Sequence, residues 1–430
     1  MAGPNAAVPA ARANSPWLWV PSLYFGQAVP YAVVTALSVI MYKNLAVSNL
    51  DIALYTSWMY LPWVIKPLWS PFVEMFGTKR YWVVALQLAI GAALALVALS
   101  MPMSHVLQAS AVLLWLMAFA SSTHDVAADG FYMLGLTQHQ QAGFVGVRST
   151  FYKLAAIACQ GVLVVLAGRL AAITGDVRFA WSLVLFVLAA LLGALGIYHH
   201  FVLPRPHCDH ASAALGSHLR AYFGTMAAFF AKKDILVILG FLLTFRLGEA
   251  QLLKMALPFL LDPLAKGGLG LSTQEVGIVY GTIGMSALVA GGLLGGAAIA
   301  RFGLARCLWP MVLCVHLPDL VFVYLASAQP QHFGLIGAAL ALEQFGYGFG
   351  FAAYLLYMIM VADGVHKTAH YAICTGFMAL GMMVPGMASG AIEQLLGYQY
   401  FFIWVCLATL PAFGMAALVK IDPEFGRKAQ

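Results

Sequence analysis

The sequence carries Leu45-Ala-Val-Ser48-Asn-Leu-Asp51-Ile52 and repeats it 224 residues later as Leu269-Gly-Leu-Ser272-Thr-Gln-Glu275-Val276. Both copies contain the Ser-x-x-Asp/Glu pattern that caps the start of a helix. Two further matches keep nearly the same offset: Gly77-Thr-Lys-Arg80 with Gly303-Leu-Ala-Arg306, at 226 residues, and Gly26-Gln27 with Gly248-Glu249, at 222 residues. Three matches at almost one offset predict two similar halves that follow each other in the same order.

The composition is that of a protein that crosses a membrane many times. Of the 430 residues, 62% are hydrophobic and only 9% are charged, and the mean hydropathy is +0.87. Water-soluble domains contain about 25% charged residues, so a water-soluble fold is not expected. The six cysteines form no CxxC pair, and most lie in apolar runs. They are therefore interpreted as reduced packing residues and not as a disulfide framework.

Apolar runs long enough to span a bilayer recur along the whole chain. A span needs about 20 mainly apolar residues. Twelve such runs are predicted, at roughly residues 17–41, 51–72, 81–101, 106–135, 143–171, 179–203, 234–261, 273–300, 306–327, 332–361, 369–395 and 399–420. Two repeated six-helix halves are typical of the major facilitator fold, so we expect an all-α membrane protein of that architecture.

The chain is expected to consist of five regions, with the longest connection between the two six-helix halves. This connection is polar, contains two prolines and lies between spans six and seven. The expected regions are an N-terminal tail at 1–16, a first six-helix half at 17–203, a central loop at 204–233, a second six-helix half at 234–420 and a C-terminal tail at 421–430.

The distribution of Lys and Arg predicts the orientation in the membrane, because cytoplasmic loops are enriched in both. With the N-terminus inside, thirteen fall on the cytoplasmic side: Arg12, Lys79, Arg80, Arg205, Arg220, Lys232, Lys233, Arg301, Arg306, Lys367, Lys420, Arg427 and Lys428. Four fall on the opposite side: Lys43, Arg169, Arg178 and Lys266. Both tails and the central loop are therefore expected in the cytoplasm.

Span four holds three ionisable side chains, in the stretch Ser121-Ser-Thr-His124-Asp125-Val-Ala-Ala-Asp129. Asp125 and Asp129 are four residues apart and share one helix face. Ionisable groups at membrane depth are costly and mark pathways, pairs or proton relays. We therefore expect Asp125 and Asp129 to couple transport to protons, with His124 as a secondary candidate. The alternative is that the two acids only cap or bracket the cytoplasmic end of the span.

Span five adds a cation to this group. Arg148 is expected to pair with Asp125 or Asp129, because an unpaired arginine at that depth would be costly. It is the third coupling candidate. Its alternative role is to extend to the cytoplasmic surface. Tyr152 and Lys153, on the same span, are secondary candidates.

Span seven contains Arg246-Leu-Gly248-Glu249, followed by Lys254 and Pro258. Arg246 and Glu249 are three residues apart and are expected to pair on one face. Glycine and proline weaken the helix here, and interrupted helices often build transporter sites. Arg246 and Glu249 are substrate-binding candidates and Lys254 is a secondary one. The alternative is a purely structural ion pair.

Three more polar groups at membrane depth complete the candidate substrate site. Lys66 lies among prolines and tryptophans in span two, and Glu343 lies in span ten before a series of glycines. Gln27 in span one corresponds to Glu249 in the repeat. Lys66 could instead be an interfacial anchor, and Glu343 could instead pair with a neighbouring helix for stability.

No motif indicates a cofactor or a catalytic centre. The chain contains no Walker A loop, no dinucleotide fingerprint, no haem attachment site and no nucleophile elbow. Histidines and one cysteine do cluster around the central loop, but their spacing matches no standard zinc pattern: His199, His200, His207, Cys208, His210 and His218. We therefore expect no cofactor, no metal and no enzymatic activity.

Four motifs in order give the chain a resemblance to a known family. They are Lys66-Pro67-Leu-Trp69-Ser-Pro71 in span two, Ser122-Thr-His124-Asp125-Val-Ala-Ala-Asp129-Gly-Phe131 in span four, Phe245-Arg246-Leu-Gly248-Glu249 in span seven and Ala341-Leu-Glu343-Gln344-Phe345 in span ten. With them the sequence resembles the muropeptide permease (AmpG-like) branch of the major facilitator superfamily. It departs from the branch at His124, where members carry Gln, at Arg246, where they carry Lys, and at Pro67 after Lys66.

The resemblance implies a secondary transporter of the bacterial inner membrane that imports a mid-sized polar solute with protons. A muropeptide or an anhydromuramyl sugar is the expected solute. A shorter sub-branch of similar size imports iron siderophores, and a siderophore importer is the alternative. A membrane sensor or scaffold without transport, or a membrane enzyme, is the alternative of another class. The expected partners are the solute, protons and the lipid bilayer, without nucleic acid, and the protein is expected to be a monomer.

Overall fold

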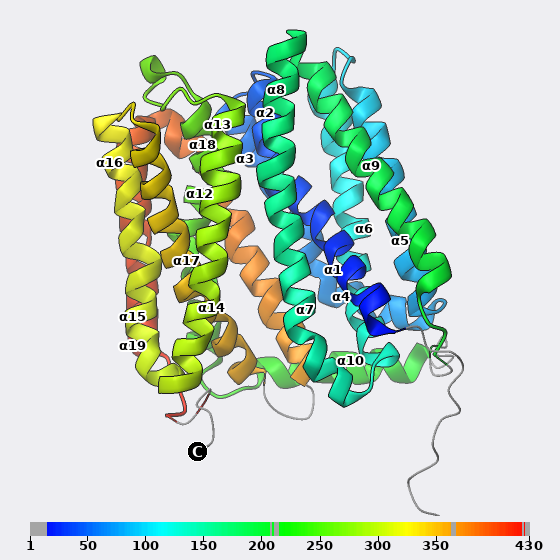
Figure 1. Cartoon of the computed structure of the whole chain (residues 1–430). Helices are drawn as coiled ribbons and strands as arrows, with labels where there is room; N and C mark the ends of the chain where they lie inside the picture. Colours follow the sequence, from blue (N-terminus) through cyan, green and yellow to red (C-terminus); the bar gives the residue numbers. More distant parts are fainter. Residues whose placement is uncertain (1–14, 207–208, 210–214, 363–366, 424, 426–430) are drawn as a thin grey trace, which may run out of the picture.

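Long helices run side by side through the whole molecule (Figure 1). The computed structural model describes residues 15–206, 209, 215–362, 367–423 and 425. We call the end at which α1 begins and α19 ends the lower end, and the opposite end the upper end, as drawn in Figure 1.

The first half contains six spans, several of which are interrupted helices. Its elements are α1 (Pro16–Ala32), η1 (Val33–Leu37), α2 (Ser38–Asn44), α3 (Asn49–Trp58), α4 (Leu61–Met75), α5 (Lys79–Ser100), α6 (Val106–Gly135), α7 (Gln138–Ile157), η2 (Ala158–Leu163), α8 (Val164–Thr174) and α9 (Val177–Val202). The first span is continuous from α1 through the π-helical η1 to α2, and the fifth from α7 through the π-helical η2 to α8.

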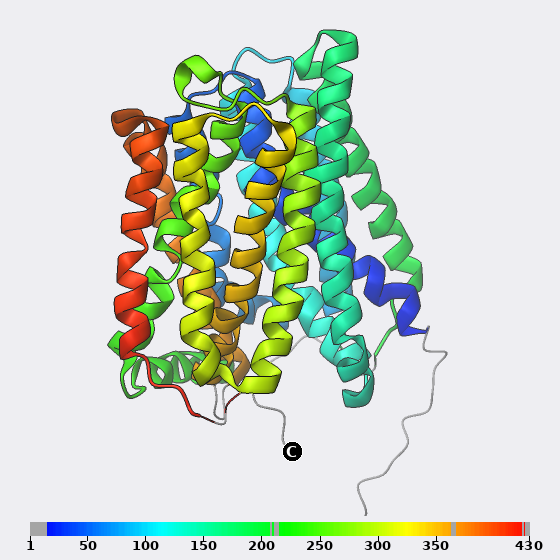
Figure 2. The ribbon, with the colours of Figure 1, turned by 60° about the vertical axis from the view of Figure 1, so that its left-hand side comes forward.

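The second half repeats this plan, and its yellow to red helices stand side by side in Figure 2. Its elements are α11 (Ile235–Thr244), α12 (Leu247–Leu261), η3 (Leu264–Lys266), α13 (Thr273–Val276), η4 (Gly277–Gly284), α14 (Met285–Phe302), α15 (Leu304–His316), η5 (Leu317–Asp319), α16 (Leu320–Ala328), α17 (Phe333–Val361), α18 (Lys367–Ala408) and α19 (Leu410–Leu418).

The predicted twelve spans are confirmed once two broken helices are considered. Ten helices of the described chain are long and apolar enough to cross a membrane. One of them is 50 residues long and bends back at Gly397, so it provides two spans. The φ of Gly397 is 70°, a value that glycine adopts readily because it has no Cβ atom. The remaining span is α3 with α4, which is interrupted at Met59 and Tyr60.

The capping signatures that define the repeat are also confirmed. The Ser48 hydroxyl accepts a hydrogen bond of 3.1 Å from the backbone N–H of Asp51 at the start of α3. At the start of α13, Ser272 accepts from the N–H of Glu275 at 3.2 Å, and the Glu275 carboxylate accepts from the N–H of Ser272 at 2.8 Å. Each cap satisfies N–H groups that the first helical turn leaves free.

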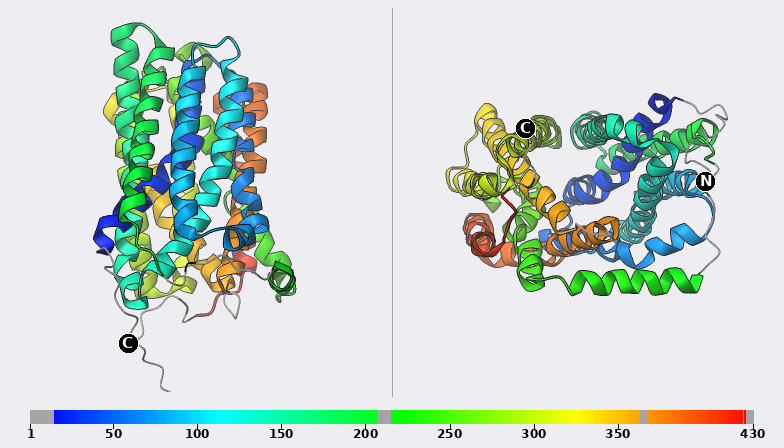
Figure 3. Two further views of the ribbon diagram at one scale, coloured as in Figure 1. Left: turned by 90° about the vertical axis from the view of Figure 1, so that its right-hand side faces the viewer. Right: turned by 90° about the horizontal axis from the view of Figure 1, so that it is seen from below.

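The described part of the connection between the halves includes a helix. It contains α10 (Leu215–Phe230), which lies across the lower end of the bundle in both Figure 1 and Figure 3. Phe229 of this helix is fully buried and belongs to the core of the second half. Apolar residues at helical spacing among polar ones form such a surface helix, and the sequence prediction of a loop missed it.

The hydrophobic core shows how the halves meet. One cluster of buried residues includes both the α1–α2 region, with Val34 and Met41, and the α12 region, with Met255 and Phe259. Toward the lower end the core divides. Trp19, Phe131 and their neighbours form a cluster of the first half, and Phe241, Tyr354 and theirs form a cluster of the second. The two halves therefore share a core at the upper end, and a smaller cluster joins the start of α4 to α12 and α18, whereas each of the two lower clusters belongs to one half.

Glycines allow the helices of opposite halves to pack closely. A Cβ atom at Gly281 of η4 would lie 1.9 Å from the backbone oxygen of Gln160 in η2, and one at Gly390 of α18 would lie 2.5 Å from the backbone oxygen of Asn49. Small residues are typical of such close contacts in membranes.

Candidate functional site

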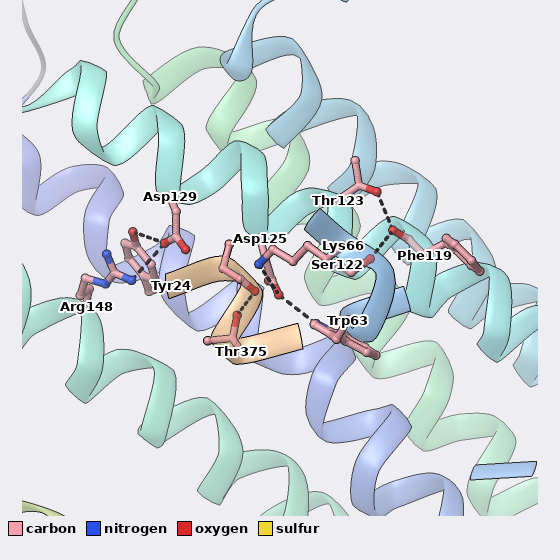
Figure 4. Close-up of polar contacts among 11 residues, drawn as sticks. Tyr24, Trp63, Lys66, Phe119, Ser122, Thr123, Asp125, Asp129, Arg148 and Thr375 are labelled. Atoms are coloured by element: carbon pink, nitrogen blue, oxygen red, sulfur yellow. Dashed lines mark hydrogen bonds and ion pairs between the residues drawn. The ribbon is translucent and has the colours of Figure 1, made fainter. Parts of the chain in front are cut away.

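Asp125 of α6 lies beside two side chains of α4 (Figure 4). Trp63 Nε1 donates a hydrogen bond of 3.0 Å to Asp125 Oδ2, and Lys66 Nζ lies 4.0 Å from the same oxygen. The side chains of Lys66 and Asp125 are 23% and 17% exposed, so the pair is largely shielded from solvent. Lys66 is therefore a partner of Asp125 and not a free interfacial anchor.

Asp129, one helical turn further along, has a different cationic partner. Arg148 Nη2 of α7 donates to Asp129 Oδ1 at 3.0 Å, and the Tyr24 hydroxyl of α1 donates to the same oxygen at 3.1 Å (Figure 4). The guanidinium carbon of Arg148 lies 4.4 Å from the ring centre of Tyr24 and 5.1 Å from that of Tyr132. The expected pairing of Arg148 is thus formed with Asp129, and the two carboxylates of α6 belong to two separate ion pairs.

Two of the other candidates of the first half lie near these pairs: Gln27 is within hydrogen-bonding reach of Asp125, and Tyr152 is within electrostatic reach of both carboxylates. His124 is buried, and both of its ring nitrogens lack a hydrogen-bond partner among the described residues. Tyr152 packs against the shared core, and Lys153 Nζ lies 3.8 Å from the position of a Cβ at Gly292 of α14. Gln27 is buried on α1, and its side-chain oxygen has no partner in the described part of the chain.

Arg246 lies where span seven is interrupted. Its φ and ψ of −107° and 18° separate α11 from α12. The guanidinium donates a hydrogen bond to the Tyr347 hydroxyl and lies 5.0 Å from the ring centre of Phe351. The expected close ion pair with Glu249 is not formed: the two groups interact electrostatically, but within the described residues neither oxygen of Glu249 accepts a hydrogen bond. Because the helix is interrupted at Arg246, the Arg246 side chain does not point in the direction expected for residues three apart in a regular helix.

Glu249 lies instead with two other carboxylates. One oxygen each of Glu249 (α12), Asp319 (η5) and Glu343 (α17) lie within 4.8 Å of one another, and all three side chains are at most 1% exposed. Glu343 Oε2 accepts from Gln344 Nε2 at 2.9 Å. The sequence interpretation missed Asp319, although an acid inside an apolar span was a signal of function.

Aromatic side chains connect the polar groups of the two halves. Tyr31 of α1 contacts Trp63 edge to face, with ring centres 5.3 Å apart, and lies within electrostatic reach of both Asp125 and Arg246. Lys254 of α12 is 2% exposed, donates to the Thr56 hydroxyl of α3 at 2.9 Å and lies 4.9 Å from the ring centre of Tyr60. Lys254 therefore crosses the boundary between the halves, which sequence spacing did not predict.

A second polar network closes the upper end. Lys43 Nζ lies 2.6 Å from Asp262 Oδ2, and Asn49 Nδ2 donates to Glu393 at 2.9 Å and to the Tyr398 hydroxyl at 2.8 Å. Tyr398 also donates to Asp262 at 2.6 Å. Lys43 and Asn49 belong to the first half, and the other three residues belong to the second. The network ties the halves together above the candidate site.

The histidine cluster does not form a metal centre in the described part of the chain. His199 is buried and forms hydrogen bonds with Ser22 Oγ at 2.9 Å and Gln87 Oε1 at 2.7 Å. His207, Cys208 and His210 lie outside the described residues, as does the side chain of His218.

Comparison with known proteins identifies the class and the family. Two of the similar proteins are named as a permease and a transporter. The anhydromuropeptide permease of Escherichia coli (strain K12) is 24% identical over 390 residues, covering 89% of this chain and 76% of the relative. A Rickettsia conorii protein named as an AmpG transporter is 26% identical over 395 residues, covering 87% and 91%.

Solved structures show the same fold. A bacterial homolog of the human lysosomal transporter Spinster aligns with a TM-score of 0.69 and 12% identity, covering 95% of this chain and 96% of that one. The xylose transporter XylE from E. coli aligns with a TM-score of 0.65 and 11% identity, covering 93% and 94%. The fold and the named relatives support a secondary transporter of the major facilitator type, and not an enzyme.

A sequence model of the BT1 family matches residues 31–303. Because this match covers more than half of the 430 residues, the chain belongs to the BT1 family.

Proposed function

We propose that the protein is a proton-coupled importer of a muropeptide or anhydromuramyl sugar across the bacterial inner membrane, with both termini in the cytoplasm. The observation that carries the proposal is the set of ion pairs Lys66–Asp125 and Arg148–Asp129 beside an aromatic-lined boundary between the halves. The name of the E. coli relative supports the choice of solute.

The proposed solute matches the chemistry of the central groups. Muropeptides carry carboxylates, amides and hydroxyls on sugar rings whose faces are apolar. Arg246 offers a guanidinium held against two aromatic rings, and Gln27 offers an oxygen without a partner among the described residues. Guanidinium groups bind carboxylates through two parallel hydrogen bonds. We assign Arg246, Gln27 and Lys66 to solute binding.

Coupling to protons is assigned to the two ion pairs of α6. An ion pair that loses its negative charge on protonation releases its cation, which then interacts elsewhere. Protonation of Asp129 would free Arg148, and protonation of Asp125 would free Lys66. Both cations lie on helices other than α6, so release changes the attraction between helices and links protonation to a rearrangement.

The shared upper core and the network around Asp262 support a conformation that is closed at the upper end. If the lower end is cytoplasmic, this is the state from which the solute is released into the cell. Import then requires the upper contacts to open and the separate lower cores to approach each other.

The experiment is solute counterflow with purified protein in liposomes, using radiolabelled anhydromuropeptide. Exchange of labelled for unlabelled muropeptide, without exchange of an iron–siderophore complex, is the expected result. Siderophore exchange alone would replace the proposed solute. Exchange of neither, with protein that is folded and inserted, would favour a sensor or scaffold.

A further inference from the structure

We propose that Glu249, Asp319 and Glu343 form a binding site for a small hard cation, a proton or a sodium ion, which is separate from the ion pairs of α6. The three residues come from spans seven, nine and ten of the second half. The site does not depend on the identity of the solute, but its use in transport rests on the proposed function.

The first step of the argument concerns charge. The nearest carboxylate oxygens of the three side chains lie within 4.8 Å of one another in a part of the protein with at most 1% exposure. Three like charges at this separation cannot all persist in a buried site without compensation. Arg246 compensates only in part: it interacts electrostatically with Glu249, but its guanidinium is directed to Tyr347 and Phe351 and donates no hydrogen bond to Glu249.

The second step concerns hydrogen bonding. An ionised carboxylate can only accept hydrogen bonds. Among the described residues, both oxygens of Glu249, both of Asp319 and one of Glu343 accept none. Buried acceptors without donors are rare in native proteins and call for an explanation. A proton on one carboxylate would supply an O–H donor to its neighbour, and a sodium ion would be coordinated by the same oxygens.

The third step concerns how the packing creates the cluster. A Cβ at Gly346 of α17 would lie 2.2 Å from the backbone oxygen of Cys314 and 2.8 Å from Pro318 Cγ. The absence of a side chain lets α17 approach the break between α15 and α16. Pro318 favours this break because it cannot donate a backbone hydrogen bond. The close approach brings Glu343 next to Asp319.

The test uses infrared spectroscopy of the full-length protein in detergent at about pH 7, where carboxylic acids in water are ionised. The variants are Glu249→Gln, Asp319→Asn, Glu343→Gln and the three together. Asp234→Asn is the matched control, because Asp234 is exposed and adopts a left-handed conformation that Asn tolerates. Folding is checked by size-exclusion chromatography and circular dichroism.

Two results would support the site and identify the cation. Protons predict a carbonyl-stretch band of protonated carboxyl groups in the parent that is lost in the triple variant and kept in Asp234→Asn. Sodium predicts no such loss, but a melting temperature of the parent that rises when NaCl replaces choline chloride, an effect lost in Asp319→Asn. A ligand that binds the folded state raises apparent stability in this way.

The site is refuted if the folded parent shows neither the band nor the response to sodium. If the triple variant does not fold, the single variants are used instead, because each removes only one carboxylate. The infrared band and the sodium-dependent melting temperature of the single variants then test the site. Failure of counterflow together with a positive result here would reject the proposed function and leave the cation site standing.

Discussion

Lys43 Nζ of the first half lies 2.6 Å from Asp262 Oδ2 of the second half, with only 13% and 7% of the two side chains exposed. Ion pairs with so little solvent contact are costly to break on one side, because the remaining charge stays buried. The pair therefore holds the upper end closed in the conformation described.

We expect Asp262→Asn to lower the free energy of unfolding by about 3 kcal/mol and to expose the upper end. The measurement is the melting temperature, together with labelling of a cysteine placed at Ala53, which is buried where α3 meets α18. The control is Lys420→Ala, whose partner Asp234 is 41% exposed and whose pair should contribute about 1 kcal/mol or less. Equal effects of the two variants would show that the upper pair has no special role.

The contact between spans five and eight gives a second prediction. Gly281→Ala should destabilise the upper-closed conformation by about 1–3 kcal/mol, because the new methyl group would overlap the backbone of Gln160. Gly296→Ala is the matched control, since no atom lies within 4 Å of its Cβ position. Thermal stability and solute uptake would be compared. If uptake and stability were unchanged in Gly281→Ala, this contact would not be part of the interface between the halves that opens during transport.

A third prediction concerns proton coupling. Asp129→Asn and Asp125→Asn should each abolish solute accumulation driven by a pH gradient, because the cation of each pair could no longer be held and released by a proton. Counterflow, which needs no net proton movement, should remain measurable in proteoliposomes. Normal accumulation by both variants would move coupling to the carboxylates of the second half.

A fourth prediction concerns solute recognition by Arg246. Replacing Arg246 with Gln should weaken solute binding about tenfold or more, as expected for the loss of a charge-assisted hydrogen bond. Isothermal titration calorimetry of the purified protein would measure it. Because Arg246 and Glu249 form no ion pair here, Glu249→Gln should change solute affinity much less. A larger effect of Glu249→Gln would return that residue to the solute site.

The fifth prediction concerns orientation. The excess of Lys and Arg in the segments expected on the side of the two tails predicts that both termini lie in the cytoplasm. Reporter fusions within 204–233 and after Gln430 should both report the cytoplasm. A periplasmic signal at either point would contradict the orientation.

The class of the protein and the order of its spans could be predicted from the amino-acid sequence. Apolar runs of about 20 residues can satisfy their backbone groups in a bilayer only as helices, so composition and length fixed the spans. The repeat at an offset of about 224 residues gave the two halves, and the capping residues Ser48 and Ser272 marked where spans begin. These are local properties, which neighbouring residues decide.

Which polar groups contact one another depends on how the helices pack and could not be predicted from the sequence. Asp125 and Asp129 share a helix face, yet one contacts Lys66 and the other Arg148, because α4 and α7 approach α6 at different heights. Asp319 joins Glu249 and Glu343 through a helix break and a glycine contact between spans. Such contacts depend on the packing of helices far apart in the chain and on the interruption at Arg246. Residue spacing within one helix predicts neither the packing of distant helices nor the position of a helix interruption.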